Sequence, residues 1–388
     1  DPYPLSDRQF LVSHNPHRDR DAKDPTAYGL YALDRSAHHK LIYDDPETSC
    51  WCAQPLRQRV RPPLTVAARD ESLAEQGLAM CSITDIYHGM ENTERGEVKW
   101  IRIMEQLPRP WAARRRWQPA CGHTQPAGGG GPLSVKLLRG VVPVESDGSA
   151  NFYVPADRNI YFSALDENFL EIQRERTFVN YRPGEVRSCV GCHETPNDTP
   201  PRYVTARQAM LKPPVMPMPQ PGDASAARPL HYSVDVQPVL DEHCVSCHGA
   251  ETPAADLRLT GEDSWLNCTS FGQLIHKGYV LGFREGSDFG GTEYSPAKTI
   301  GSWKSPLMRQ IMKGCPGDND EPMTQAEFVR IATWVDTNGV YSGSYWGRLV
   351  PPHAEHPNYR PITTLEESLS TINPYEEWTP DWVPPVKQ

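Results

Sequence analysis

Short apolar runs separated by turn residues fill the beginning of the chain. Apolar side chains dominate positions 10–12, 28–33 and 41–43, and each run has the length of a strand. This rhythm predicts a β-meander over residues 1–60 that resembles one blade of a propeller. One blade cannot bury both of its faces, so we expect it to pack on another domain or to be the last blade of a longer chain.

The β pattern continues over residues 61–186. Stretches that alternate or run apolar over strand lengths lie at 83–87, 97–103, 135–138, 151–155 and 160–165. Asp147 and Gly148 supply a tight turn between two of these strands. The pattern predicts a small β-sandwich with the glycine tract at 128–131 as a surface loop.

Prolines then interrupt the chain. Between residues 200 and 229, eight of thirty positions are proline. Neither a helix interior nor a central strand accommodates that density. We therefore expect residues 187–232 to hold an extended connector.

Beyond the connector the apolar period changes from two to 3.6. Apolar residues at helical spacing over 236–243 lead directly into Cys244. Capping signals bound two more helices, at 305–314 and 324–339. These features predict a mostly α-helical domain over residues 233–345.

The expected fold class is therefore α+β and multidomain. A β-rich N-terminal region, made of the blade-like segment and the sandwich, precedes the mostly α-helical domain. The predicted divisions are 1–60, 61–186, 187–232, 233–345 and an extended arm at 346–388, where prolines and aromatics alternate without a period.

Charge and hydropathy exclude two kinds of partner. The 388 residues include 39 Lys and Arg and 49 Asp and Glu, which gives a net charge of −10. This acidic balance, with no long basic block in the sequence, argues against nucleic acid as a partner. No stretch reaches the ~18 apolar residues of a membrane span. The first twenty residues are too charged for a signal-peptide core, so we expect that any export signal has been removed.

Two identical cysteine motifs carry the clearest chemistry. Cys189, Cys192 and His193 form one C-x-x-C-H sequence, and Cys244, Cys247 and His248 form the other. This is the attachment signature of haem c: two thiols form thioethers to one porphyrin, and the histidine presents its imidazole to the iron. Two covalently bound haems are therefore expected, with His193 and His248 as iron ligands. The helical region at 233–345 is then expected to be a cytochrome c-like domain that holds the second haem. The alternatives are a zinc ribbon, whose pairs are usually only 15–20 residues apart, and two disulfides, which leave both histidines unexplained.

Covalent haem predicts a periplasmic or extracellular protein, where disulfides also form. Six further cysteines are available for up to three of them. Cys268 and Cys315 are a candidate pair in the second-motif domain, with ligation of a haem by Cys315 as the alternative. Cys50 and Cys52 are too close for an easy mutual bridge and are expected to pair elsewhere, with Cys81 or Cys121 as candidates.

The remaining axial ligands stay open at this point. For the second haem, His276 and Met323 are nearly equal candidates, while Met308 and Met312 are more simply explained as helix core. For the first haem the candidates are His88, His123, His231 or no ligand at all. A missing ligand would leave that iron open to a substrate.

The chain resembles the hydrazine synthase alpha-subunit-like family. The resemblance is carried by the segments 142–149, 161–166, 182–185, 188–194, 235–241 and 334–338. It implies two covalent haems outside the cytoplasm and a match to the C-terminal half of family members, which usually carry a β-propeller ahead of it. In hydrazine synthase the first motif histidine binds zinc and a tyrosine four residues later ligates the iron. Here that position is Asn197, and the next tyrosine is Tyr203, which favours His193 as an ordinary iron ligand.

Three functions remain in competition. The leading hypothesis is a di-haem cytochrome c that transfers electrons to a redox partner, another cytochrome or other subunits of a larger complex. The second is a haem enzyme acting on a small nitrogen compound or a peroxide at the first haem. The third is an architectural haem protein in a filament or complex.

Overall fold

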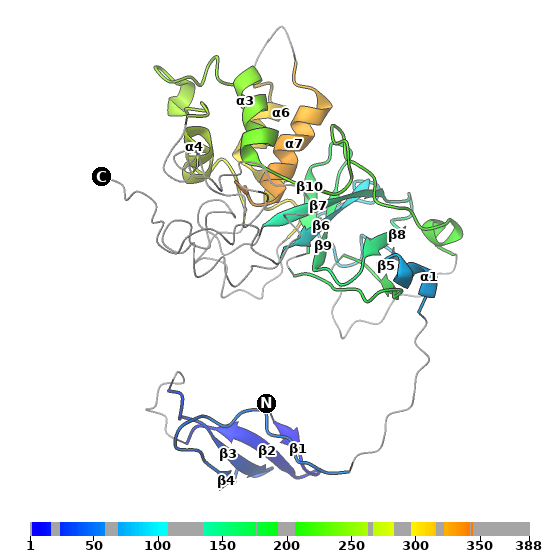
Figure 1. Cartoon of the computed structure of the whole chain (residues 1–388), viewed down its shortest axis with the longest axis vertical. Helices are drawn as coiled ribbons and strands as arrows, with labels where there is room; N and C mark the ends of the chain where they lie inside the picture. Colours follow the sequence, from blue (N-terminus) through cyan, green and yellow to red (C-terminus); the bar gives the residue numbers. More distant parts are fainter. Residues whose placement is uncertain are drawn as a thin grey trace, which may run out of the picture. The chain divides into compact units, whose positions relative to one another are not determined.

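The computed structural model describes residues 2–16, 24–58, 69–107, 135–175, 177–192, 206–262, 267–282, 296–315, 322–341 and 343. The chain divides into two compact units, residues 1–67 and residues 68–388 (Figure 1). Cys121, His123, His193 and the arm predicted at 346–388 lie outside the described residues. The described residues cover the other predicted divisions of the second unit only in part.

The first unit is an antiparallel sheet with its four strands in chain order: β1 (Tyr3–Pro4), β2 (Gln9–His14), β3 (Gly29–Asp34) and β4 (His39–Tyr43). Leu11 and Tyr31 are buried, but all five residues of β4 are exposed. A single sheet of four strands cannot bury both of its faces by itself. Its role as the last blade of a propeller stays a prediction.

The second unit contains two sheets. The larger has the strand order β10 (Glu171–Arg174), β9 (Ile160–Leu165), β6 (Trp100–Gln106), β7 (Lys136–Pro143) and β12 (Arg228–Pro229). The smaller has the order β11 (Val186–Cys189), β5 (Leu78–Ile83) and β8 (Ala150–Pro155), and α1 (Glu71–Glu75) precedes β5.

A shared apolar core joins the two sheets into the predicted sandwich. Cys81 and Phe152 of the smaller sheet are fully buried in one cluster with Ile101, Ile103 and Phe162 of the larger sheet. Alternating side chains of each strand enter this core because successive residues point to opposite faces.

The strand predicted at 83–87 is wrong. The strand is β5, which ends at Ile83, and a turn follows in which the His88 N–H donates to the Asp85 carbonyl. Asp85 favours the turn because its side chain also accepts from the Tyr87 N–H. The turn predicted at Asp147 and Gly148 is confirmed between β7 and β8.

The second half of the chain is less helical than predicted. Its helices are η1 (Gln208–Leu211), η2 (Tyr232–Val236, a π-helical turn), α3 (Gln237–His243), η3 (Ala254–Asp256), α4 (Thr269–His276), α5 (Gly301–Lys304), α6 (Pro306–Met312) and α7 (Gln325–Asp336). The described residues are 21% helical and 26% strand, so a mostly α-helical cytochrome c domain is not supported. Most of these helices are a turn or two long, and irregular segments separate them.

The longest helix, α7, begins where its sequence predicts. Thr324 accepts from the Glu327 N–H and the Glu327 carboxylate accepts from the Thr324 N–H, which completes the capping box. Asn338 and Gly339 end it with φ values of +64° and +68°. None of the described helices is long and apolar enough to cross a membrane.

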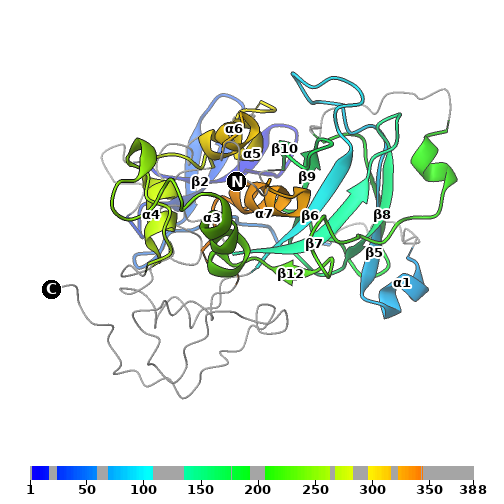
Figure 2. The same cartoon turned by 90° about the horizontal axis from the view of Figure 1, so that it is seen from above.

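The second unit has three layers. The helices around α3 and α7 cover one face of the five-stranded sheet, and the three-stranded sheet covers the other (Figures 1 and 2). Met104, Leu138 and Tyr161 of the larger sheet lie in one buried cluster with Val239 of α3 and Trp334 of α7. The five-stranded sheet therefore separates the segments that carry the two cysteine motifs.

A buried ion pair crosses the boundary between the helices and the sheet. Arg102 of β6 donates from Nη1 to Oδ2 of Asp336 of α7 at 2.7 Å, and both side chains are fully buried. Arg102 also donates to Gln220 and to the Phe169 carbonyl, while Asp336 accepts from the Ser302 N–H. Both charges are thus compensated without water.

We predict that Arg102→Met lowers the free energy of unfolding by about 3–5 kcal/mol, because Asp336 would remain as a buried charge without its partner. Chemical denaturation followed by tryptophan fluorescence measures this. Arg258→Met is the matched control: its pair with Glu262 is partly exposed, and its loss should cost less than about 1 kcal/mol. Equal losses in the two variants would contradict a central role for Arg102.

Candidate haem-attachment sites

The first cysteine motif begins at the end of β11, which pairs in parallel with β5. The Cys189 carbonyl accepts from the Thr84 N–H at 2.9 Å, and the Val190 carbonyl accepts from the Asp85 N–H at 2.8 Å. Gly191 lies so close to the backbone of His88 that a Cβ at this position would be 2.3 Å from the His88 carbonyl oxygen. The motif is therefore attached to the turn at residues 84–88 and requires glycine between its cysteines.

Thiol, hydroxyl and carboxyl groups lie close to one another beside this motif. Hydrogen bonding with Cys189 and burial raise the pKa of the Cys81 thiol well above its usual value. Burial, together with the Glu175 carboxylate, raises the pKa of Cys192. Burial and the nearby thiols Cys81 and Cys189 also raise the pKa of the Tyr181 hydroxyl. These groups are neutral at physiological pH.

The carboxyl of Glu175 is half-buried beside the same group. Burial raises its pKa from 4.5 to about 8, even though the Phe162 N–H donates to it at 3.0 Å. Sequence patterns gave no sign of Glu175 and Tyr181 as part of the site. The parallel pairing of β5 with β11 brings Cys81 to Cys189 across more than a hundred residues, and no local pattern encodes such a contact.

The candidate ligands of the first haem lie in different places. His88 contacts the first motif through Gly191, and His123 and the motif's own His193 lie outside the described residues. His231 is buried beside Leu230 and Tyr232, which belong to the core of the helical layer. The structure therefore brings His88 and not His231 to the first motif.

The second motif follows directly on α3. Cys244 is the C-terminal cap of this helix and is buried, whereas Cys247 is exposed. The His248 N–H donates to the Cys244 carbonyl at 2.9 Å, which folds the motif back on itself. The Nδ1 of His248 lies 2.8 Å from the Leu257 carbonyl oxygen. Because a carbonyl only accepts, Nδ1 carries the proton and Nε2 keeps a lone pair for a metal. His248 thus fits the role of a haem iron ligand.

A pocket of 530 Å³ is lined by residues of α6 and α7 and by Cys315, which neighbours Cys244. Its lining includes Cys315, Met323 and Phe328, and burial and the neighbouring Cys315 raise the pKa of Cys244 to about 12. Met323 therefore lies on the wall of a cavity beside the second motif. His276 is exposed at the C-terminal end of α4.

The two other methionines behave differently from each other. Met308 is fully buried in the core of the helical layer, as predicted. Met312 is 57% exposed at the end of α6, so its prediction as helix core is wrong. The helix ends at Met312, whose side chain lines a pocket together with residues of α7.

No disulfide joins any two of the cysteines in the described ranges. The pair expected between Cys268 and Cys315 is not formed: Cys268 is buried with its sulfur 3.3 Å from the Ser270 hydroxyl, while Cys315 is exposed. Cys81 is fully buried in the sandwich core of the second unit, and Cys50 and Cys52 belong to the first unit. Cys121 lies outside the described residues.

The fold and these motifs define a class of protein. In this class a sandwich of two sheets carries one C-x-x-C-H motif, and a helical layer packed on the sandwich carries the other. Residues 96–194 match the family model of the hydrazine synthase alpha subunit middle domain. That segment runs from just before β6 to the end of the first motif.

A curated relative and a solved structure point the same way. The chain is 24% identical over 229 residues to hydrazine synthase subunit alpha of Kuenenia stuttgartiensis, covering 50% of this chain and 27% of the relative. The solved hydrazine synthase of Kuenenia stuttgartiensis has a similar fold, with a TM-score of 0.56 at 17% identity over 88% of this chain and 54% of that one. The chain thus spans about a quarter to a half of the length of these relatives. Together the matches support a hydrazine synthase-like family, through its middle domain rather than the C-terminal half alone.

We predict that Glu175→Gln removes a pH-dependent loss of stability. The folded pKa of about 8 lies above the ordinary 4.5, so proton binding by this carboxyl stabilises the folded state. This stabilisation is complete below pH 4.5 and is lost as the pH rises through 8. The melting temperature of the variant should therefore rise relative to wild type between about pH 5 and about pH 9.

Glu251→Gln is the control for this titration, because Glu251 is exposed in the same unit. Its melting temperature should follow that of wild type across the whole range. A gap between Glu175→Gln and wild type that stays constant with pH would show that Glu175 ionises normally.

Proposed function

We propose that the chain is a haem enzyme of the hydrazine synthase type, which acts on a small nitrogen compound at the first motif and receives electrons through the second. The observation that supports this most is the extent of the family match: it covers β6 to β11 of the two sheets and ends on the first motif. The segment shared with hydrazine synthase is thus the one that would hold the first haem.

Each motif supplies the residues that a haem c needs. Cys189 and Cys192 would form the thioethers of the first haem, with His193 following them, and Cys244, Cys247 and His248 would hold the second. When bound, a haem supplies an iron that changes oxidation state and, at an open axial position, binds a small ligand.

Glu175 provides a protonatable group at the first motif. Burial raises its pKa to about 8, which allows the carboxyl to hold and release a proton near neutral pH. Reactions that reduce or join small nitrogen compounds consume or release protons. We propose Glu175 as the group that exchanges them with the reacting molecule.

For the second haem we propose Met323 as the sixth ligand. Its place in the pocket beside Cys315 and Cys244 supports it over His276, which is exposed. A histidine and a methionine together would raise the potential relative to two histidines and make this iron an electron inlet.

Electron transfer without catalysis is the second candidate, and one observation favours it. Asn197 occupies the position at which the family places the tyrosine that ligates the first iron. If the protein only transfers electrons, both irons would be six-coordinate. Covalently attached haems would favour a location outside the cytoplasm for either function. The relative is named as a subunit, which supports our proposal that this chain works in a larger complex with a redox partner.

We predict that carbon monoxide binds one of two haems in the reduced protein. Cys189→Ala with Cys192→Ala should remove half of the haem and all of the carbon monoxide binding, because the open iron is lost. Cys244→Ala with Cys247→Ala is the matched control and should also remove half of the haem but keep the binding. Haem content by pyridine haemochrome and difference spectra measure both, and no binding in the wild type would favour electron transfer alone.

We predict that Met323→Leu lowers the potential of the second haem, since leucine cannot replace the thioether ligand. His276→Leu should leave that potential unchanged, because the side chain does not reach the pocket. Redox titration of both variants decides between the ligands. The opposite result would identify His276 as the ligand.

A further inference from the structure

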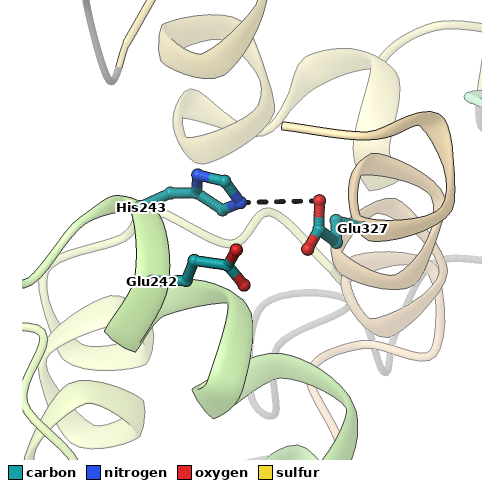
Figure 3. Close-up of side chains that lie close together, drawn as sticks. All are labelled: Glu242, His243 and Glu327. Carbon is teal, nitrogen blue, oxygen red and sulfur yellow. Dashed lines mark ion pairs between the residues drawn. The ribbon is translucent and has the colours of Figure 1, made fainter. Parts of the chain in front are cut away.

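A histidine and two glutamates meet between α3 and α7, outside both cysteine motifs. Glu242 and His243 are the last residues of α3, and Glu327 lies in the first turn of α7 (Figure 3). One ligand atom of each residue lies within 4.8 Å of the other two. The carboxylate of Glu242 points toward that of Glu327.

The imidazole of His243 has a buried nitrogen that forms no hydrogen bond. Only 3% of this side chain is exposed, and its Nε2 is 3.4 Å from Oε2 of Glu327. That contact does not have the geometry of a hydrogen bond, and no other group in the described part of the chain provides one. A buried polar nitrogen in this state costs free energy unless something binds it.

Glu327 is held in place independently of His243. Its Oε2 accepts from the N–H and the hydroxyl of Thr324, both at 2.7 Å. The capping box of α7 therefore fixes the carboxylate beside the imidazole. Glu242 is exposed, so the third side of the group is open to solvent.

We infer that Glu242, His243 and Glu327 bind a divalent metal ion, with zinc as the ion that fits best. Zinc binds imidazole nitrogen and carboxylate oxygen at about 2.0–2.2 Å, and a tetrahedral site then separates its ligand atoms by about 3.3–3.5 Å. The 3.4 Å between His243 and Glu327 already matches this spacing. Glu242 closes the site by a small movement of an exposed side chain, and water takes the fourth position.

The donor set also argues against other cations. Calcium and magnesium prefer sites made of oxygen atoms alone, whereas an imidazole with two carboxylates suits zinc and its neighbours in the transition series. Two carboxylates balance the charge of one divalent ion. The competing explanation is a simple ion pair between a protonated His243 and Glu327, which would bind no metal.

A metal here would join the attachment helix of the second motif to α7. His243 directly precedes Cys244, and Glu327 begins the helix that carries Asp336. The ion would therefore stabilise the end of α3 from which the second haem would be held. This site is separate from the cysteine motifs and does not depend on the reaction proposed above.

The test is a zinc titration of the full chain with its haems attached, after removal of metals by a chelator. Isothermal calorimetry should show one equivalent of tightly bound zinc, and zinc should raise the melting temperature. Glu242→Gln should weaken this binding by more than about tenfold, since mutation of even an outer-shell partner lowers metal affinity by about 10–100-fold. Because Glu242 is exposed, this substitution should leave the folding of the protein unchanged.

Two further variants separate ligation from helix capping and charge. Glu327→Gln should also lose the zinc equivalent yet keep its cap, because glutamine serves at this position of a capping box. Glu251→Gln, an exposed acid of the same region, should bind zinc as wild type does. Zinc binding that is equal in Glu242→Gln, Glu327→Gln and Glu251→Gln, or absent from wild type, would overturn the proposal, whatever the haem spectra show.

Discussion

The arrangement of the second unit depends on the buried pair of Arg102 and Asp336. The pair joins β6 to α7, and neither side chain is exposed. Arg174 and Glu171 of β10 form a second buried pair on the same sheet, and Asp336 accepts from the Ser302 N–H of α5. Charges buried this way tolerate few alternative packings, because any shift leaves one of them without its partner. The helical layer is thus held in one register on the five-stranded sheet.

This interface determines how the two cysteine motifs are placed. The first follows β11 in the three-stranded sheet, and the second follows α3 in the helical layer. The five-stranded sheet lies between them (Figure 2). If both motifs hold haem, the sheet and its buried pair set the separation that an electron must cross. The proline-rich connector joins the layers in sequence, while the ion pair joins them in space.

Local signals in the sequence predicted local structure well. The helix before Cys244, the capping box of Thr324 and Glu327 and the turn at Asp147 depend on neighbours within a few residues, and all three are present. The contact of Cys81 with Cys189 and that of His243 with Glu327 depend on pairing between distant elements. The expected Cys268–Cys315 disulfide failed for the same reason, since proximity within a domain does not determine which side chains face each other. The predicted helical content was too high because capping signals mark where helices begin but say little about the irregular segments between them.

The central claim is that the first motif holds a haem with an axial position open for a small nitrogen compound. The electron paramagnetic resonance spectrum of the oxidised protein tests this most directly. The account predicts one high-spin ferric haem from the first motif and one low-spin ferric haem from the second, in equal amounts. A spectrum in which both haems are low-spin would contradict it and leave a protein that only transfers electrons.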